Sequence, residues 1–222
     1  MLKTLKAVGV STVLVSGLSG LTLAVQPERP DRTALVERFT QRVQAYVAMH
    51  RQIERFLPPQ QIFTDPAEAR RSMVGMANAM RALRPNAAEG DIFDAEIGNL
   101  LRDDIWHALR NTGIDPEPLV AEMVPEVPGD YPAPVVNGNF SWGLANVMPP
   151  CVLRALPELP IELQYRFVGV DLVLIDLHAN LVVDILRDAL PGEDARITSA
   201  ARGGGSQETN PRSVHERLTA CD

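Results

Sequence analysis

The stretch from Ile161 to Leu186 constrains the fold more than any other part of this 222-residue chain. Leu163, Tyr165 and Phe167 alternate with polar residues, which is the period of a half-buried strand. Two further apolar segments rich in β-branched residues follow, separated by a glycine and by a turn-like group at 176–180. The stretch therefore predicts a three-stranded antiparallel meander with short connections.

The polar residues of this stretch are interpreted as ordinary strand-end and turn residues. They are Asp171, Asp176, His178 and Asp184. Polarity is expected where strands begin, end or turn, without any functional reason. On this interpretation the meander stabilises the fold and carries no site.

The N-terminal half has the periodicity of helices. Apolar residues spaced by three and four predict a long helix that ends at Pro58-Pro59, a second that starts at Asp65-Pro66, and a third from about Asp94 to Arg110. Amphipathic helices joined by short connections are expected to pack on one another as a small bundle. Ten of the 18 prolines then fall between Pro116 and Pro160, which predicts a turn-rich connector with short helices.

These patterns divide the chain into five parts. We predict a signal peptide at 1–24, a helical region at 25–114, a Pro-rich connector at 115–160, a meander packed on the helices at 161–190 and a flexible tail at 191–222. Helices and strands are segregated along the chain, so we predict an α+β fold with 25–190 as one domain.

The first residues predict export. Lys3 and Lys6 precede an apolar run that reaches Val25, and Thr22-Leu23-Ala24 places small residues at a cleavage site. An uncleaved anchor helix is the alternative, because the run approaches the ~20 residues that span a bilayer. Cleavage is favoured, since glycines and hydroxylated residues make a poor permanent span. The mature protein is then expected in the periplasm of a bacterium or outside the cell, without membrane contact.

The charge balance argues against nucleic acid as a partner. Removing Lys3 and Lys6 with the signal takes the formal net charge from −7 to −9. Residues 115–222 carry 16 acidic residues against 7 arginines. An acidic surface repels nucleic acid and anionic membranes.

Cys151 and Cys221 are the only cysteines. In an oxidising compartment they could form a disulfide, which would stabilise the fold by about 4 kcal/mol. The alternative is that both stay reduced, because Cys221 is next to the chain end, where order is usually low.

Motifs for catalysis are missing from the sequence. There is no Gly-x-Ser-x-Gly elbow, and the mature chain has no lysine. Cys151 stands between a proline pair and apolar residues, a poor setting for a reactive thiolate. We therefore predict no catalytic residue and no cofactor.

Three acid–histidine pairs have the spacing of metal ligands: Asp104 with His107, His50 with Glu54, and Asp176 with His178. Residues three or four apart share a helix face, which is how metal sites in helix bundles are assembled. The repeated Glu-x-x-His motif of such bundles is absent, so the two helical pairs are interpreted as exposed surface. Asp104, His107, Asp176 and His178 remain the alternative set of metal ligands.

The sequence favours a non-enzymatic binding or structural module of the bacterial cell envelope. Its partner would be a protein or another envelope component. The aromatic loop from Tyr131 to Trp142 could line a groove for this partner, or could close the join between helices and meander. The alternative function is that of a periplasmic hydrolase or metal-binding protein that uses the Asp/His pairs.

Overall fold

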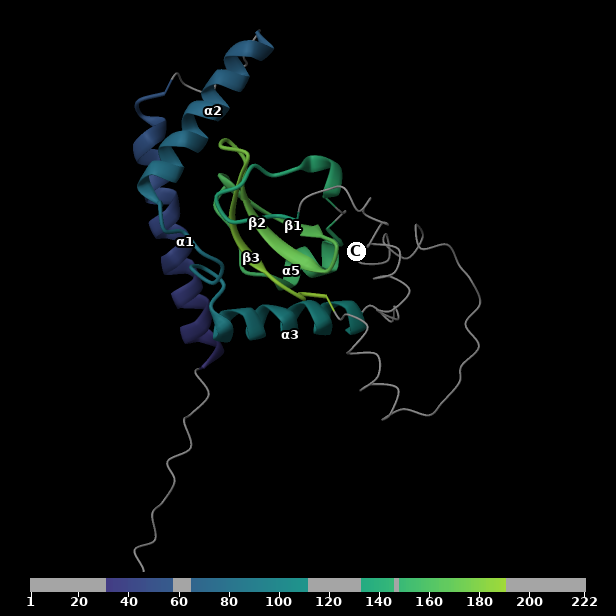
Figure 1. Cartoon of the computed structure of the whole chain (residues 1–222). Helices are drawn as coiled ribbons and strands as arrows, with labels where there is room; N and C mark the ends of the chain where they lie inside the picture. Colours follow the sequence, from purple (N-terminus) through teal and green to yellow (C-terminus); the bar gives the residue numbers. More distant parts are fainter. Residues whose placement is uncertain (1–30, 58–64, 112–132, 146–147, 191–222) are drawn as a thin grey trace, which may run out of the picture.

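The protein has an α+β fold, in which three helices are followed by a three-stranded sheet (Figure 1). The computed structural model describes residues 31–57, 65–111, 133–145 and 148–190. The helices are α1 (Arg32–Glu54), α2 (Pro66–Leu83), α3 (Ala95–Asn111) and the short α5 (Pro150–Ala155), with a 3-10 turn η1 (Trp142–Leu144). The strands are β1 (Leu163–Val168), β2 (Asp171–Asp176) and β3 (Leu181–Leu186). The predicted signal peptide, the tail and much of the connector lie outside the described residues.

Local capping explains where two of the helices begin. The Asp65 side chain accepts a hydrogen bond from the N–H of Ala67 at 2.8 Å, with Pro66 in the first helical position of α2. Asp94 accepts from the N–H groups of Glu96 and Ile97 at 3.1 and 2.9 Å at the start of α3. The predicted starts of both helices are confirmed.

The sheet is antiparallel with the order β1-β2-β3, which confirms the predicted meander. Val168 pairs with Asp171, so only two residues connect β1 to β2. The first of them, Gly169, has a φ of 59°, a conformation that two-residue hairpin turns need and that glycine adopts at little cost.

A β-bulge in β3 changes the order in which its side chains face the two sides of the sheet. Leu174 pairs with Asp184, but Ile175 pairs with Val182, so Val183 is an extra residue. Val183 belongs to the core beneath the helices, and Asp184 bonds to the loop before α3 on that same side. Two consecutive residues of β3 therefore face the helices.

The helices share one core with the sheet. Side chains of the three long helices, among them Phe39, Met80 and Leu101, pack against one face of the sheet. Leu172 and Leu174 of β2 lie on that face. Figure 1 shows α1 and α2 alongside each other and α3 crossing the N-terminal part of α1. α1 contacts both α2 and α3, and this common core joins the three helices to the sheet. None of the described helices has the length and apolar character needed to cross a membrane.

The other face of the sheet is covered by the segment 133–145. Phe140 and Leu144 of this segment pack on Val173, Ile175 and Val182. The described part of the predicted aromatic loop thus covers the meander, while Tyr131 lies outside the described residues.

The possible disulfide between Cys151 and Cys221 is not tested by the described residues. Cys151 is buried in α5. Cys221 lies outside the described residues, so the pairing stays a prediction.

Candidate metal centre

Three polar residues of α1 point toward the end of the sheet. Tyr46, His50 and Glu54 are spaced by four, so they lie along one face of the helix. Tyr46 and His50 are each 1% exposed, because the end of β2 and the following turn cover them. The interpretation of the pair His50 and Glu54 as exposed helix surface is wrong for His50.

Asp176, the last residue of β2, is fully buried opposite this face. Its Oδ2 accepts hydrogen bonds from the Tyr46 hydroxyl at 2.8 Å and from Nδ1 of His50 at 2.6 Å. Its Oδ1 accepts from the N–H of Ala179 at 2.8 Å. Three donors compensate for the cost of burying the carboxylate. The interpretation of Asp176 as an ordinary strand-end residue is therefore wrong, because its carboxylate links the sheet to α1.

His178 lies on the turn between β2 and β3, with its side chain 5% exposed. Its Nε2 is 3.1 Å from the hydroxyl oxygen of Ser72 on α2. Its Nδ1 is 3.6 Å from a carboxylate oxygen of Glu54 and has no hydrogen-bond partner among the described residues. A buried polar atom without a partner costs about 1–3 kcal/mol. This nitrogen is therefore a candidate ligand atom.

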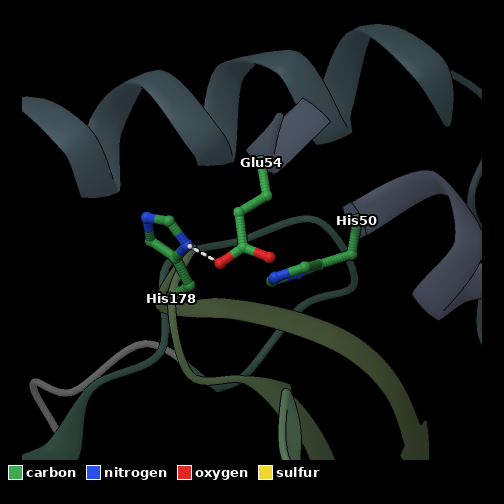
Figure 2. A group of neighbouring side chains, drawn as sticks. All are labelled: His50, Glu54 and His178. Carbon is green, nitrogen blue, oxygen red and sulfur yellow. Dashed lines mark ion pairs between the residues drawn. The ribbon is translucent and has the colours of Figure 1, made fainter. Parts of the chain in front are cut away.

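His50, Glu54 and His178 converge on one point (Figure 2). One possible ligand atom of each lies within 4.8 Å of the other two. Figure 2 shows the Glu54 carboxylate between the two imidazole rings, with one nitrogen of His178 joined to it by a dashed line. A zinc ion at about 2.0–2.2 Å from each donor needs the three atoms somewhat closer together.

The pKa values of the two histidines are shifted in opposite directions. Burial opposes protonation of His50, but the hydrogen bond and charge of Asp176 outweigh it and raise the pKa of His50. Burial lowers the pKa of His178, and the positive charge of His50 lowers it further. The lowered pKa of His178 favours its neutral ring, the form that binds a metal. Nδ1 of His50 donates a hydrogen bond to Asp176. Nε2 of His50 can then bind a cation once it has lost its proton, which is the usual carboxylate–histidine–metal arrangement.

The structure separates the four alternative metal ligands. Asp176 and His178 lie together, with His178 as a possible ligand and Asp176 as the partner that orients His50. Asp104 forms an ion pair with Arg32 at 2.5 Å, and His107 is exposed on α3. The α3 pair does not belong to the group that converges.

Two members of the site carried little signal in the sequence. The sequence gives His50 and Glu54 the spacing of metal ligands but favours an exposed surface for them, and no motif points to Ser72. Ser72 occupies the core-facing side of an amphipathic helix, where a small residue is common and has no special meaning. Its proximity to His178 depends on contacts between residues 106 positions apart.

Ser72, His178 and Glu54 also form a hydroxyl–imidazole–carboxylate series, which is the arrangement of nucleophilic hydrolases. Ser72 lies inside α2 and is 6% exposed. The N–H groups around it donate to carbonyls one turn back in the helix, so they cannot stabilise an oxyanion. The hydroxyl is better explained as the partner that fixes the ring orientation of His178.

No family model, no curated protein and no solved structure matches this chain. The function is therefore argued from the geometry of His50, Glu54 and His178 and from the residues that orient them.

Proposed function

We propose that the protein is an exported metal-binding protein of the bacterial cell envelope, and that His50, Glu54 and His178 hold one divalent cation. The buried Nδ1 of His178 carries the proposal: it lies 3.6 Å from the Glu54 carboxylate and has no closer hydrogen-bond partner among the described residues. A cation at this point gives that nitrogen a partner and neutralises the nearby carboxylate. Export is part of the proposal and rests on residues 1–24 alone.

The ligand set favours zinc or a similar transition ion. Imidazole nitrogens suit zinc, copper, nickel and iron, whereas calcium and magnesium take oxygen ligands almost alone. Two imidazoles and one carboxylate make a mixed set that a calcium site does not use. Asp176 and Ser72 supply the hydrogen bonds to the far ring nitrogens that metal-binding histidines usually have.

The test is a zinc titration of the full chain, purified without a histidine tag and treated with a chelator. We expect one zinc ion per chain by calorimetry and by elemental analysis. Glu54→Gln keeps the size of a half-exposed side chain and is expected to weaken binding strongly. His178→Gln is expected to do the same, because it removes a second ligand.

His107→Ala is the matched control, since it removes an exposed histidine outside the site. It should leave zinc binding unchanged, with circular dichroism used to confirm folding of every variant. A folded protein that binds no zinc would overturn the proposal. Binding that is lost in His107→Ala but kept in Glu54→Gln would instead assign the metal to Asp104 and His107.

A further inference from the structure

Glu162 places a further carboxylate beside the candidate metal centre. It directly precedes β1, and its backbone C=O accepts a hydrogen bond from the N–H of Leu177 at 2.9 Å, in the turn that carries His178. Oε1 of its side chain accepts from Nε of Arg51 at 2.6 Å, in the last turn of α1. Glu162 therefore contacts both segments that supply the candidate ligands, the end of α1 and the turn between β2 and β3.

The carboxylate of Glu162 is charged and largely buried. Its side chain is 11% exposed, and Oε2 is buried with no hydrogen-bond partner among the described residues. Burial alone would raise the pKa of Glu162, but the hydrogen bond from Arg51 and the charges of Arg51 and His50 lower it. A negative charge thus lies within electrostatic range of His50, in surroundings where it attracts a nearby cation more strongly than it would in water.

Arg51 has the opposite effect on a cation at this place. Its side chain is 53% exposed, and its guanidinium lies on the Glu162 carboxylate. A divalent ion at the candidate centre is attracted by Glu162 and repelled by Arg51. Water and salt screen the exposed guanidinium more than the buried carboxylate, so the attraction exceeds the repulsion.

From this placement we infer that Glu162 belongs to the candidate metal centre and sets its affinity for a divalent ion by charge, with Arg51 as the opposing charge; the inference rests on the proposed metal site. The ligands remain His50, Glu54 and His178, and Glu162 acts on the ion through its electric field. This attraction grows with the charge of the ion, so a divalent ion gains about twice as much as a monovalent one.

The experiment measures the Kd for zinc by calorimetry on the full chain, purified without a histidine tag and treated with a chelator. Glu162→Gln removes the charge but keeps the size and an oxygen that accepts from Arg51. We expect it to bind zinc roughly tenfold more weakly or worse, as is usual when a residue supporting a metal site is changed. Arg51→Gln should instead bind zinc more tightly than the native protein, because it removes the repelling charge.

Two control variants make the same charge changes away from the centre. Glu37→Gln lies at an exposed position near the other end of α1, and Arg110→Gln lies at an exposed position near the end of α3. Both should leave the Kd unchanged. Added salt should reduce the effect of Arg51→Gln more than that of Glu162→Gln, because the guanidinium is the more exposed of the two charges.

The outcomes separate this inference from the proposed function. Native protein that binds zinc no better than Glu162→Gln would overturn the inference and leave the metal site standing, whereas native protein that binds no zinc would overturn both. Weaker binding by a folded Arg51→Gln would show that the ion pair acts by holding the structure, which also overturns the inference. Circular dichroism confirms the folding of each variant, and Arg51→Gln, at an exposed position, keeps the test decisive should Glu162→Gln fail to fold.

Discussion

Asp184 is a buried carboxylate whose hydrogen bonds are all supplied by the backbone. It is fully buried in β3 and accepts from the N–H groups of Gly90, Ile92, Phe93 and Ile185 at 2.7–2.9 Å. Burial raises the pKa of Asp184, although the four donors favour its charged form. The carboxylate fixes the loop before α3 to the sheet, and so it positions the start of that helix.

Replacing Asp184 should therefore destabilise the whole domain. Asp184→Ala leaves several buried N–H groups without an acceptor, and we expect the free energy of unfolding to fall by about 3 kcal/mol or more. Urea denaturation followed by circular dichroism measures this. Asp103→Ala, at an exposed position of α3, should leave the midpoint unchanged. Equal midpoints for the two variants would contradict the role given to Asp184.

The two histidines of the candidate centre should titrate on opposite sides of the ordinary value in metal-free protein. We expect His50 above and His178 below a pKa of about 6.5, measured by NMR of the ring protons. Asp176→Asn should lower the pKa of His50, because it removes the charge that favours the protonated ring. Two histidines that titrate on the same side would contradict this electrostatic account.

These shifts have opposite effects on stability. The stability that neutral His178 contributes is present above about pH 6.5 and is lost as the pH falls, because the unfolded chain binds the proton more readily. The stability that protonated His50 contributes is present below about pH 6.5 and is lost as the pH rises through its folded-state pKa. His178→Gln should therefore make the domain less sensitive to acid.

At the scale of single residues, the sequence identified polar positions but not their surroundings. The sequence predicts ordinary strand-end and turn residues at Asp176, His178 and Asp184, but all three are buried. Burial of Asp176 depends on Tyr46, which is 130 positions away in the chain. A single sequence shows spacing within an element, and it does not show which elements meet.

At the scale of elements, two helical glycines should respond oppositely to the same change. A Cβ on Gly98 in α3 would be 2.8 Å from Cδ1 of Leu186, a buried side chain of β3. A Cβ on Gly75 in α2 would have ordinary contact, 3.5 Å from Cδ2 of Leu57. Gly75→Ala should raise the free energy of unfolding by about 0.5–1 kcal/mol through helix propensity.

Gly98→Ala should lower the free energy of unfolding by about 1–2 kcal/mol, because overpacking against the sheet exceeds the gain in propensity. Thermal melts of both variants measure the two effects. A stabilised Gly98→Ala would show that Leu186 moves aside easily and that α3 is not held closely against β3.

The elements themselves were well predicted, because their signals are local. Asp65-Pro66 starts α2, and the alternation from Leu163 to Phe167 produces β1. The bulge in β3 was not predicted, since it depends on the pairing of Val182 and Asp184 with β2. Alternation in one strand cannot show an extra residue that only its neighbour reveals.

At the scale of the whole molecule, the candidate metal centre joins segments that are distant in the sequence. Its ligands come from the C-terminal turn of α1 and from the turn between β2 and β3, and Ser72 adds a contact from α2. The segregation of helices and strands predicted the α+β class. The meeting of these three segments was not predictable, because it is set by the shared core and not by any motif.

Zinc should therefore stabilise the whole domain. At a zinc concentration 100 times the Kd, mass action adds about 2.7 kcal/mol to the free energy of unfolding. This corresponds to a rise in Tm of roughly 5–10 °C for a domain of this size. Differential scanning fluorimetry with zinc and with chelator measures the shift. Glu54→Gln should show little of it, and an unchanged Tm in the native chain would count against the site.

The bulge at Val183 also determines where this protein can change in length. Along β3, side chains alternate between the two faces of the sheet, and this alternation shifts by one residue at Val183. Loss of Val183 would leave Asp184, Ile185 and Leu186 on their present faces, at the cost of a cavity under the helices. Loss or gain of one residue elsewhere in β3 would exchange the faces of its neighbours. Among the positions of this strand, Val183 is the one at which evolution can shorten the chain without reversing the sheet.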